Sequence, residues 1–156
     1  MRLRGQAPRH REIDTLFHMR TKSLLATAAA LAASGLLILQ AQNPQNFTGG
    51  APTPLDEKPQ GNIAHYRFAP GSRSKWHSHD GGQIILQEEG VGLAQVRGGP
   101  VIELHAGDTL WCPPGVEHWH GAAPDKGGVQ YNVSRGGIKW LEEVSEKDYT
   151  AKPTHR

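Results

Sequence analysis

Cysteine is almost absent from this 156-residue chain, and an excess of positive over negative charge is missing beyond its N-terminal part. Cys112 is the only cysteine, so the chain cannot form an intrachain disulfide. From residue 42 onward, eleven Lys and Arg residues stand against thirteen Asp and Glu residues, although the whole chain carries a formal charge of +2. Binding to nucleic acid requires a concentrated basic patch. The composition therefore argues against a nucleic acid partner.

Long apolar runs are also rare, and the main one lies close to the N-terminus. Residues 23–39 (SLLATAAALAASGLLIL) carry no charged side chain and follow two basic residues. This order is typical of a secretory signal peptide, whereas a membrane-spanning helix needs roughly 20 apolar residues. We predict a leader over residues 1–41, with Met19 as an alternative true start and cleavage after Ala41, which directs the protein to the periplasm or out of the cell. The alternative is an uncleaved leader that anchors the chain in the membrane.

Glycine and proline, by contrast, are abundant, with 19 and 11 residues. They separate short runs with strand character over residues 62–150, a pattern typical of an all-β sandwich or barrel. We expect strands at Ile63–Phe68, Lys75–His79, Gln83–Gln87, Gly92–Arg97, Val101–Leu104, Thr109–Cys112, His118–Ala122 and Val129–Ser134. Residues 42–61 are predicted to be a linker or N-terminal arm, and residues 151–156 a tail. A short helix is expected within residues 138–149, with Ser145 as its cap.

Histidines occur in two pairs that share one spacing. His77 and His79 are two residues apart in a strand-like run, and His118 and His120 repeat this spacing about forty residues later. Because strand side chains alternate between two faces, both members of each pair point to the same side. Convergent imidazoles bind divalent transition metals well. Two such pairs beside Gly/Pro turns predict a metal site rather than a chance surface pattern.

Two motifs around these histidines resemble those of the cupin superfamily. They read Gly71-x5-His77-x-His79-x3-Gln83-x6-Gly90 and Gly107-x5-Pro113-x-Gly115-x2-His118. The resemblance implies a single all-β cupin barrel of the double-stranded β-helix, jelly-roll type. It also implies four metal ligands, which are His77, His79, Gln83 and His118. Two positions depart from the usual motifs, since Gln83 replaces a glutamate and Ala122 replaces an asparagine.

Within that superfamily, residues 70–83 (PGSRSKWHSHDGGQ) and 107–124 (GDTLWCPPGVEHWHGAAP) are similar to the small bacterial cupin hydroxynitrile lyases. Those enzymes use manganese and make or break (R)-cyanohydrins such as mandelonitrile. The similarity implies manganese here, although iron, zinc, nickel or cobalt also suit nitrogen and oxygen ligands. It further implies a small-molecule pocket that includes Tyr66, Ser74, Gln130 and Ser134. One departure is that Gln130 stands where the lyases have an active-site histidine.

The chemistry of the site follows from its neutral ligands. With Gln83 in place of a carboxylate, a bound ion keeps its full charge and favours anionic groups, so Lewis-acid catalysis is expected. His120, next to the ligands but not among them, is expected to act as a general base or acid; its alternative role is to orient a ligand. The alternative functions are a cupin dioxygenase or other oxidoreductase, and a non-catalytic metal-binding or small-molecule-binding cupin. We also expect a homodimer or homotetramer.

Overall fold

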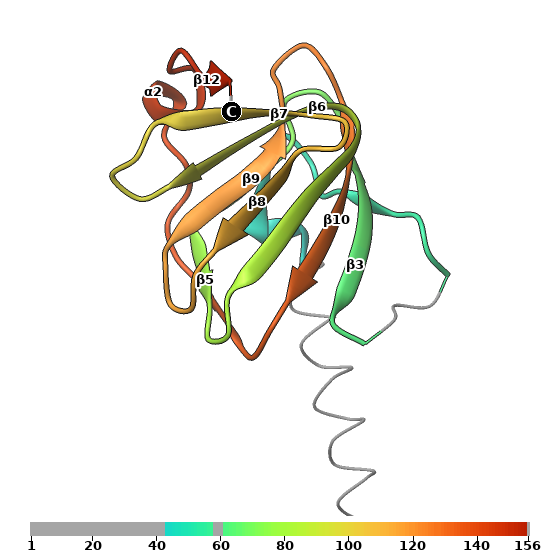
Figure 1. The fold of residues 1–156 in the computed structure, drawn as a ribbon. Helices are drawn as coiled ribbons and strands as arrows, with labels where there is room; N and C mark the ends of the chain where they lie inside the picture. Colours follow the sequence, from blue (N-terminus) through green and yellow to red (C-terminus); the bar gives the residue numbers. More distant parts are fainter. Residues whose placement is uncertain (1–42, 58–60, 156) are drawn as a thin grey trace, which may run out of the picture. The chain divides into compact units, whose positions relative to one another are not determined.

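The computed structural model describes residues 43–57 and 61–155, so the predicted leader lies outside the described residues. The described residues form a curled twelve-stranded sheet (Figure 1). Its strands are β1 (Phe47–Thr48), β2 (Thr53–Pro54), β3 (Ile63–Phe68), β4 (Arg73–Ser74), β5 (His77–His79), β6 (Gln83–Val96), β7 (Val101–His105), β8 (Thr109–Cys112), β9 (His118–Ala122), β10 (Gly128–Ser134), β11 (Ile138–Trp140) and β12 (Thr154–His155). A 3₁₀ turn, η1 (Pro44–Asn46), and a helix, α2 (Glu146–Tyr149), complete the fold. The predicted all-β barrel with a short C-terminal helix is confirmed.

Strand β6 connects the two halves of the sheet. Its first half pairs with β8 and β10, and its second half pairs with β7 and β9. The sequence predicted two strands here, at 83–87 and 92–97, and this was wrong because the chain bends without leaving the sheet. The bend contains a register shift opposite Val129 and Gln130, and Gly90 adopts a φ of 70°. A β-bulge of this kind bends a strand and redirects its side chains.

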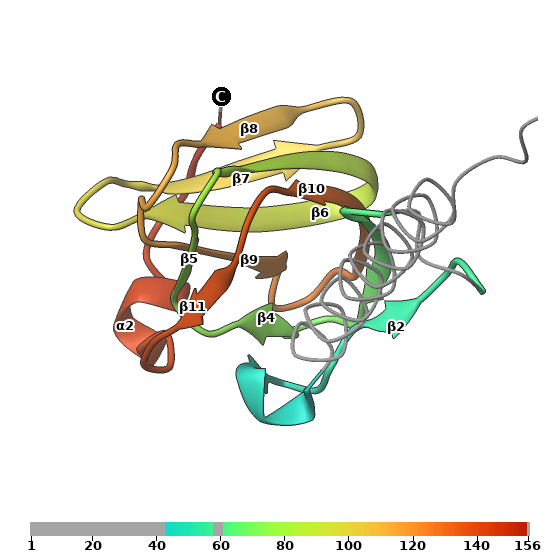
Figure 2. The same ribbon diagram turned by 90° about the horizontal axis from the view of Figure 1, so that it is seen from below.

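The segments that precede and follow the barrel in the chain also pair with it. Figure 2 shows β2 and α2 from below. Strand β1 pairs with β4 and β2 pairs with β3, so the described part of residues 42–61 adds two short strands. Strand β12 runs parallel to β7. Ser145 caps α2 by accepting a hydrogen bond of 3.1 Å from the Asp148 amide, as predicted. No helix among the described residues is long and apolar enough to span a membrane.

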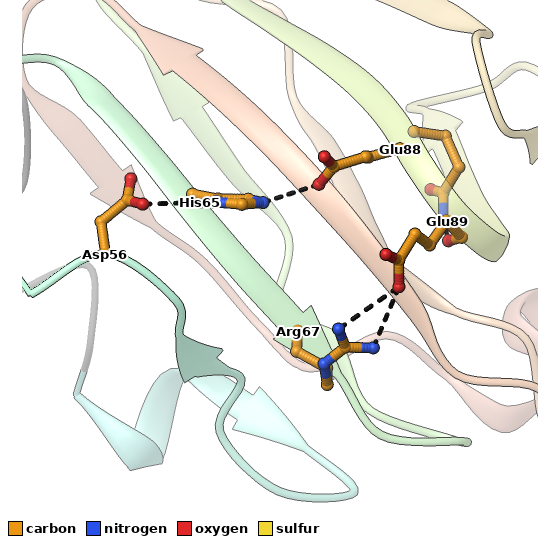
Figure 3. Close-up of polar contacts among 6 residues, drawn as sticks. Asp56, His65, Arg67, Glu88 and Glu89 are labelled. Carbon is orange, nitrogen blue, oxygen red and sulfur yellow. Dashed lines mark hydrogen bonds and ion pairs between the residues drawn. The ribbon is translucent and has the colours of Figure 1, made fainter.

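On the outer face, His65 joins the arm to the sheet (Figure 3). Its Nδ1 lies 3.3 Å from Asp56, its Nε2 lies 2.7 Å from Glu88, and its ring stacks on Tyr131 with 3.8 Å between ring centroids. Both ring nitrogens of His65 lie against these two carboxylates, so His65 is not part of the predicted metal site.

The interior packs behind the predicted site and holds it in place. Trp76 and Trp119 belong to one buried cluster with Tyr149 of α2. The guanidinium of the buried Arg73 lies 3.9 Å from the centroid of the Tyr149 ring and also pairs with Glu146. The Tyr149 hydroxyl donates to the Ala122 carbonyl at 2.9 Å. The C-terminal helix is thus tied to β4 and to β9, the strand that carries His118 and His120.

Candidate metal centre

The two histidine pairs lie on β5 and β9, which are hydrogen-bonded neighbours. His77 stands directly opposite His118 in the register, and 4.4 Å separates their ring centroids. His79 is on the same face of β5, with its ring centroid 5.9 Å from that of His118. One nitrogen from each of these three rings lies within 4.8 Å of the others, so the group could hold a metal ion. The alternation of strand side chains therefore brings the first three expected ligands together.

Backbone carbonyls fix which nitrogen of His77 and of His118 faces the centre. Nδ1 of His77 lies 2.9 Å from the Lys75 carbonyl, and Nδ1 of His118 lies 3.0 Å from the Val116 carbonyl. A carbonyl oxygen can only accept, so both Nδ1 atoms carry hydrogen and both Nε2 atoms offer a lone pair. The two nitrogens of His79 are buried and have no hydrogen-bond partner among the described residues. A metal ion would supply a partner for all three rings.

Gln83 is the fourth expected metal ligand, and it lies beside His118. Its Oε1 lies 2.7 Å from Nε2 of His118, while its Nε2 donates to the Ser134 hydroxyl at 2.9 Å. The Ser134 hydroxyl can donate or accept, so the Gln83 amide can also turn to donate to Nε2 of His118. With the amide oxygen toward the centre, Oε1 of Gln83 and Nε2 of His118 both offer lone pairs to the same point. A divalent metal ion fits this arrangement of three imidazoles and one amide oxygen.

Burial keeps the whole histidine cluster neutral. Loss of solvation lowers the pKa of His77 well below its usual value, lowers that of His79 to about 4, and lowers that of His120 to about 3. The neighbouring imidazole of His118 lowers all three further. Neutral imidazoles are the form that binds metal. The cluster is therefore ready to coordinate at neutral pH without first losing protons.

These pKa values predict that the metal-free protein becomes less stable in mild acid. Above pH 6.5, His79 and His120 are neutral in both the folded and the unfolded chain, so they do not make the free energy of unfolding change with pH. From pH 6.5 down to about 4, the unfolded chain binds protons at both residues and the folded chain does not. The free energy of unfolding should then fall by about 1.4 kcal/mol per group and pH unit. Urea unfolding at several pH values checks this, and a constant midpoint over that interval would contradict it.

A cavity of about 50 Å³ opens beside the centre, enough for several waters or a small ligand. Its walls come from the histidine strands, from β3, β4, β6 and β10, and from residues of the arm and of β11. They comprise Phe47, Ala64, Tyr66, Phe68, Ser74, His77, His79, Gln83, His120, Asn132, Ser134, Ile138 and Trp140. Of the four residues expected in a pocket, Tyr66, Ser74 and Ser134 line this cavity. Gln130 does not, because it lies behind His120, with its Oε1 2.9 Å from Nδ1 of that ring.

Two further residues in the wall were not predicted as part of the site. Asn132 is 2% exposed, and neither atom of its amide has a hydrogen-bond partner among the described residues. The indole nitrogen of Trp140 is also buried without such a partner. Buried polar groups normally have partners, so both residues could bind a polar ligand in the cavity. The polar alternation of β10 was the available signal for Asn132, whereas the sequence around Trp140 gives none.

Cys112 takes no part in the centre. Its side chain is fully buried in an apolar cluster with Ile85 and Leu104. Burial raises the pKa of its thiol to about 12, so it stays protonated at neutral pH. A protonated thiol is a poor metal ligand. Cys112 is thus a core residue.

Comparisons with known proteins agree with this fold. The Cupin domain family matches residues 64–133. The (R)-mandelonitrile lyase of Granulicella tundricola is 40% identical over 90 residues, which are 55% of this chain and 69% of that enzyme. The crystal structure of a cupin-like protein from Thermotoga maritima is 40% identical, with a TM-score of 0.59 over 69% of this chain and 87% of that one. A double-stranded β-helix protein from Klebsiella pneumoniae, at 20% identity and a TM-score of 0.50, covers 62% of this chain and 84% of its own and shares the fold alone.

Proposed function

We propose, starting from the fact that the chain belongs to the cupin superfamily, that it is a metal-dependent lyase that cleaves cyanohydrins to an aldehyde and hydrogen cyanide. The observation that carries the proposal is the group of three buried imidazoles, His77, His79 and His118, each with one nitrogen within 4.8 Å of the others. With the Gln83 amide beside them, they offer a cation a set of neutral ligands. The likeness to a mandelonitrile lyase supports the choice of reaction.

The ion would be held by His77, His79, Gln83 and His118. When bound, a divalent ion such as manganese supplies Lewis acidity, which stabilises negative charge that develops on a substrate oxygen. None of the four ligands is charged, so the ion's charge is not reduced by a carboxylate. The iron oxygenases instead pair two histidines with one carboxylate. This difference favours lyase chemistry over dioxygenation.

His120 would carry the proton. It lines the cavity, and a neutral imidazole has one nitrogen lone pair that can accept the hydroxyl proton of a cyanohydrin. As that proton leaves, the oxygen's electron pair forms the carbonyl bond, and the carbon–carbon bond to cyanide breaks. Cyanide departs with that bonding pair and takes up the proton from His120, giving hydrogen cyanide. The amide of Asn132 and the indole N–H of Trp140 are placed to orient the substrate in the cavity.

One panel of assays separates this function from its alternatives. The purified protein is loaded with Mn²⁺ and tested for release of benzaldehyde and cyanide from mandelonitrile, and for oxygen uptake with small phenols and other organic substrates. Cyanohydrin cleavage that stops with a chelator and returns with Mn²⁺ supports the lyase. Oxygen uptake without cleavage would establish a dioxygenase instead. Metal binding with neither reaction would establish a binding protein.

Gln83→Glu tests the role of the neutral ligand. The variant should still bind Mn²⁺, because a carboxylate oxygen is a good ligand for this ion. The added negative charge should weaken cyanide binding and lower kcat for cyanohydrin cleavage, by roughly tenfold for each 1.4 kcal/mol of lost charge stabilisation. Cyanide inhibition and steady-state kinetics on the metal-loaded variant measure both effects. Cleavage as fast as in the parent would show that the ion's full charge is not needed.

We further propose that the protein self-associates as a dimer or tetramer. Ile84 and Trp111 support this, because they pair across β6 and β8 and remain 37% and 45% exposed. Sedimentation at micromolar concentration should give a mass above one chain, and Trp111→Glu should reduce that mass. A parent mass of one chain would contradict self-association.

We also propose that the protein is exported. The apolar stretch at 23–39 supports export. Mass spectrometry of periplasmic protein should find a chain that begins near Gln42. Intact chain in the cytosol would contradict export.

A further inference from the structure

His120 stands at one end of a buried chain of hydrogen bonds. Its Nδ1 lies 2.9 Å from Oε1 of Gln130, and Nε2 of Gln130 lies 2.9 Å from Oε1 of Gln87. This series of hydrogen bonds ends where Nε2 of Gln87 donates to the Glu89 carbonyl at 2.6 Å. Gln87 and Gln130 are 0% and 1% exposed. Neither lines the cavity, so neither can touch a substrate there.

Backbone carbonyls determine which atom donates and which accepts in each of these hydrogen bonds. The Glu89 carbonyl can only accept, so the amino group of Gln87 must face it and the Gln87 oxygen must face Gln130. The Gln130 amino group donates to that oxygen and, at 3.1 Å, to the Gly121 carbonyl, which also only accepts. The oxygen of Gln130 is therefore left for His120, and Nδ1 of His120 must be the donor. Nε2 of His120 is then the nitrogen with the lone pair.

The fold leaves space for this pair of amides. Gln87 and Gln130 are opposite each other in the register of β6 and β10, next to the register shift. A Cβ atom at Gly92 would collide with Oε1 of Gln87, and it would lie 2.8 Å from Nε2 of Gln130. A Cβ at Gly128 would approach Nε2 of Gln87 to 2.5 Å. Two glycines and a bulge thus accommodate two buried side chains that add polar groups to the core.

We propose that Gln130 and Gln87 are positioning residues that fix the tautomer of His120. They hold hydrogen on Nδ1 and keep the Nε2 lone pair available as the proton acceptor. The hydrogen bond at one imidazole nitrogen determines which nitrogen carries the proton, and a base in the wrong tautomer cannot accept at the required atom. The role in catalysis rests on the proposed lyase function, whereas the tautomer itself does not.

Nuclear magnetic resonance of the metal-free protein tests the tautomer directly. Long-range proton–nitrogen correlation spectra of histidine-labelled protein near neutral pH distinguish a protonated ring nitrogen from one with a lone pair. The His120 signals, assigned by their loss in His120→Ala, should show hydrogen on Nδ1 only. Hydrogen on Nε2, or a mixture of the two forms, would overturn the proposal. This measurement requires no substrate, so it stands even if cyanohydrins are not cleaved.

Variants then connect the tautomer to turnover. Gln130→Leu removes the acceptor, and Gly92→Ala displaces both amides without removing a polar group. Each should give mixed His120 tautomers and lower kcat roughly 10–100-fold, as loss of a partner behind a functional histidine typically does, with KM and Mn²⁺ content unchanged. Gln95→Leu is the matched control, because this amide also makes two hydrogen bonds from β6 but contacts Trp119 and Gly99. An equal loss of kcat in the control, or an unchanged tautomer in Gln130→Leu, would overturn the proposal.

Discussion

His120→Ala should lower kcat for cyanohydrin cleavage by about 10²–10⁴-fold, the usual contribution of a general acid–base group. The imidazole lines the cavity and is hydrogen-bonded through Nδ1 to Gln130, which leaves Nε2 for the substrate. The three-histidine group is complete without it, so Mn²⁺ content should stay at the parent level. Steady-state kinetics and elemental analysis of the same preparation measure the two effects.

The matched control for this prediction is His105→Ala. His105 lies at the end of β7, and its side chain pairs with Glu103 on the surface. Its removal should change neither kcat nor metal content. If His120→Ala loses Mn²⁺, the residue is a ligand or supports one, and its role as a base is wrong. If kcat stays within a few-fold of the parent, another group accepts the proton.

His77→Ala or His118→Ala should abolish tight metal binding. The two rings face each other across β5 and β9, and each offers one lone pair to the centre because its other nitrogen donates to a backbone carbonyl. Loss of a partner outside the ligand shell typically costs roughly 10–100-fold in affinity, so loss of a ligand should weaken Mn²⁺ binding by more than about 100-fold. Competition with a chelator of known affinity measures the change. Unchanged affinity in either variant would refute the site.

The folded state of these two variants must be checked separately. Replacing a buried histidine with alanine leaves a cavity, and cavities in cores destabilise proteins by about 2–5 kcal/mol. His118→Phe fills the same space with a ring that cannot coordinate metal, and it tests the same ligand with less disturbance. Circular dichroism of each metal-free variant should match that of the metal-free parent. Lost binding in a folded His118→Phe variant then reports on the ligand and not on the fold.

Strand alternation made the centre predictable from sequence. Residues two apart on a strand share a face, so His77 and His79 could be placed together without a structure, as could His118 and His120. Register, which the sequence does not specify, put the two pairs opposite each other. Gln130 was expected in the pocket from the similarity to the lyases. The register shift in β10 and the hydrogen bond to Gln87 instead place it behind His120.

Other features depend on contacts between residues far apart in the chain. The continuity of β6 was missed because Glu88, Glu89 and Gly90 resemble a turn, whereas a bulge accommodates them within one strand. Trp140 reaches the cavity only because β11 pairs with β5. The tautomers of His77, His118 and His120 follow from individual carbonyl and amide partners. No local pattern in the sequence encodes these partners.

A crystal structure of the Mn²⁺-loaded protein, with anomalous diffraction to locate manganese, tests the central claim most directly. The account predicts one strong anomalous peak per chain, bonded to Nε2 of His77, Nε2 of His118 and Oε1 of Gln83, at about 2.0–2.3 Å as is usual for nitrogen and oxygen ligands of such ions. His79 should provide the fourth bond, and Nε2 of His120 should remain unbonded and face the cavity. A peak elsewhere, for example between His105 and His155 on the surface, or no peak at all, would contradict the account.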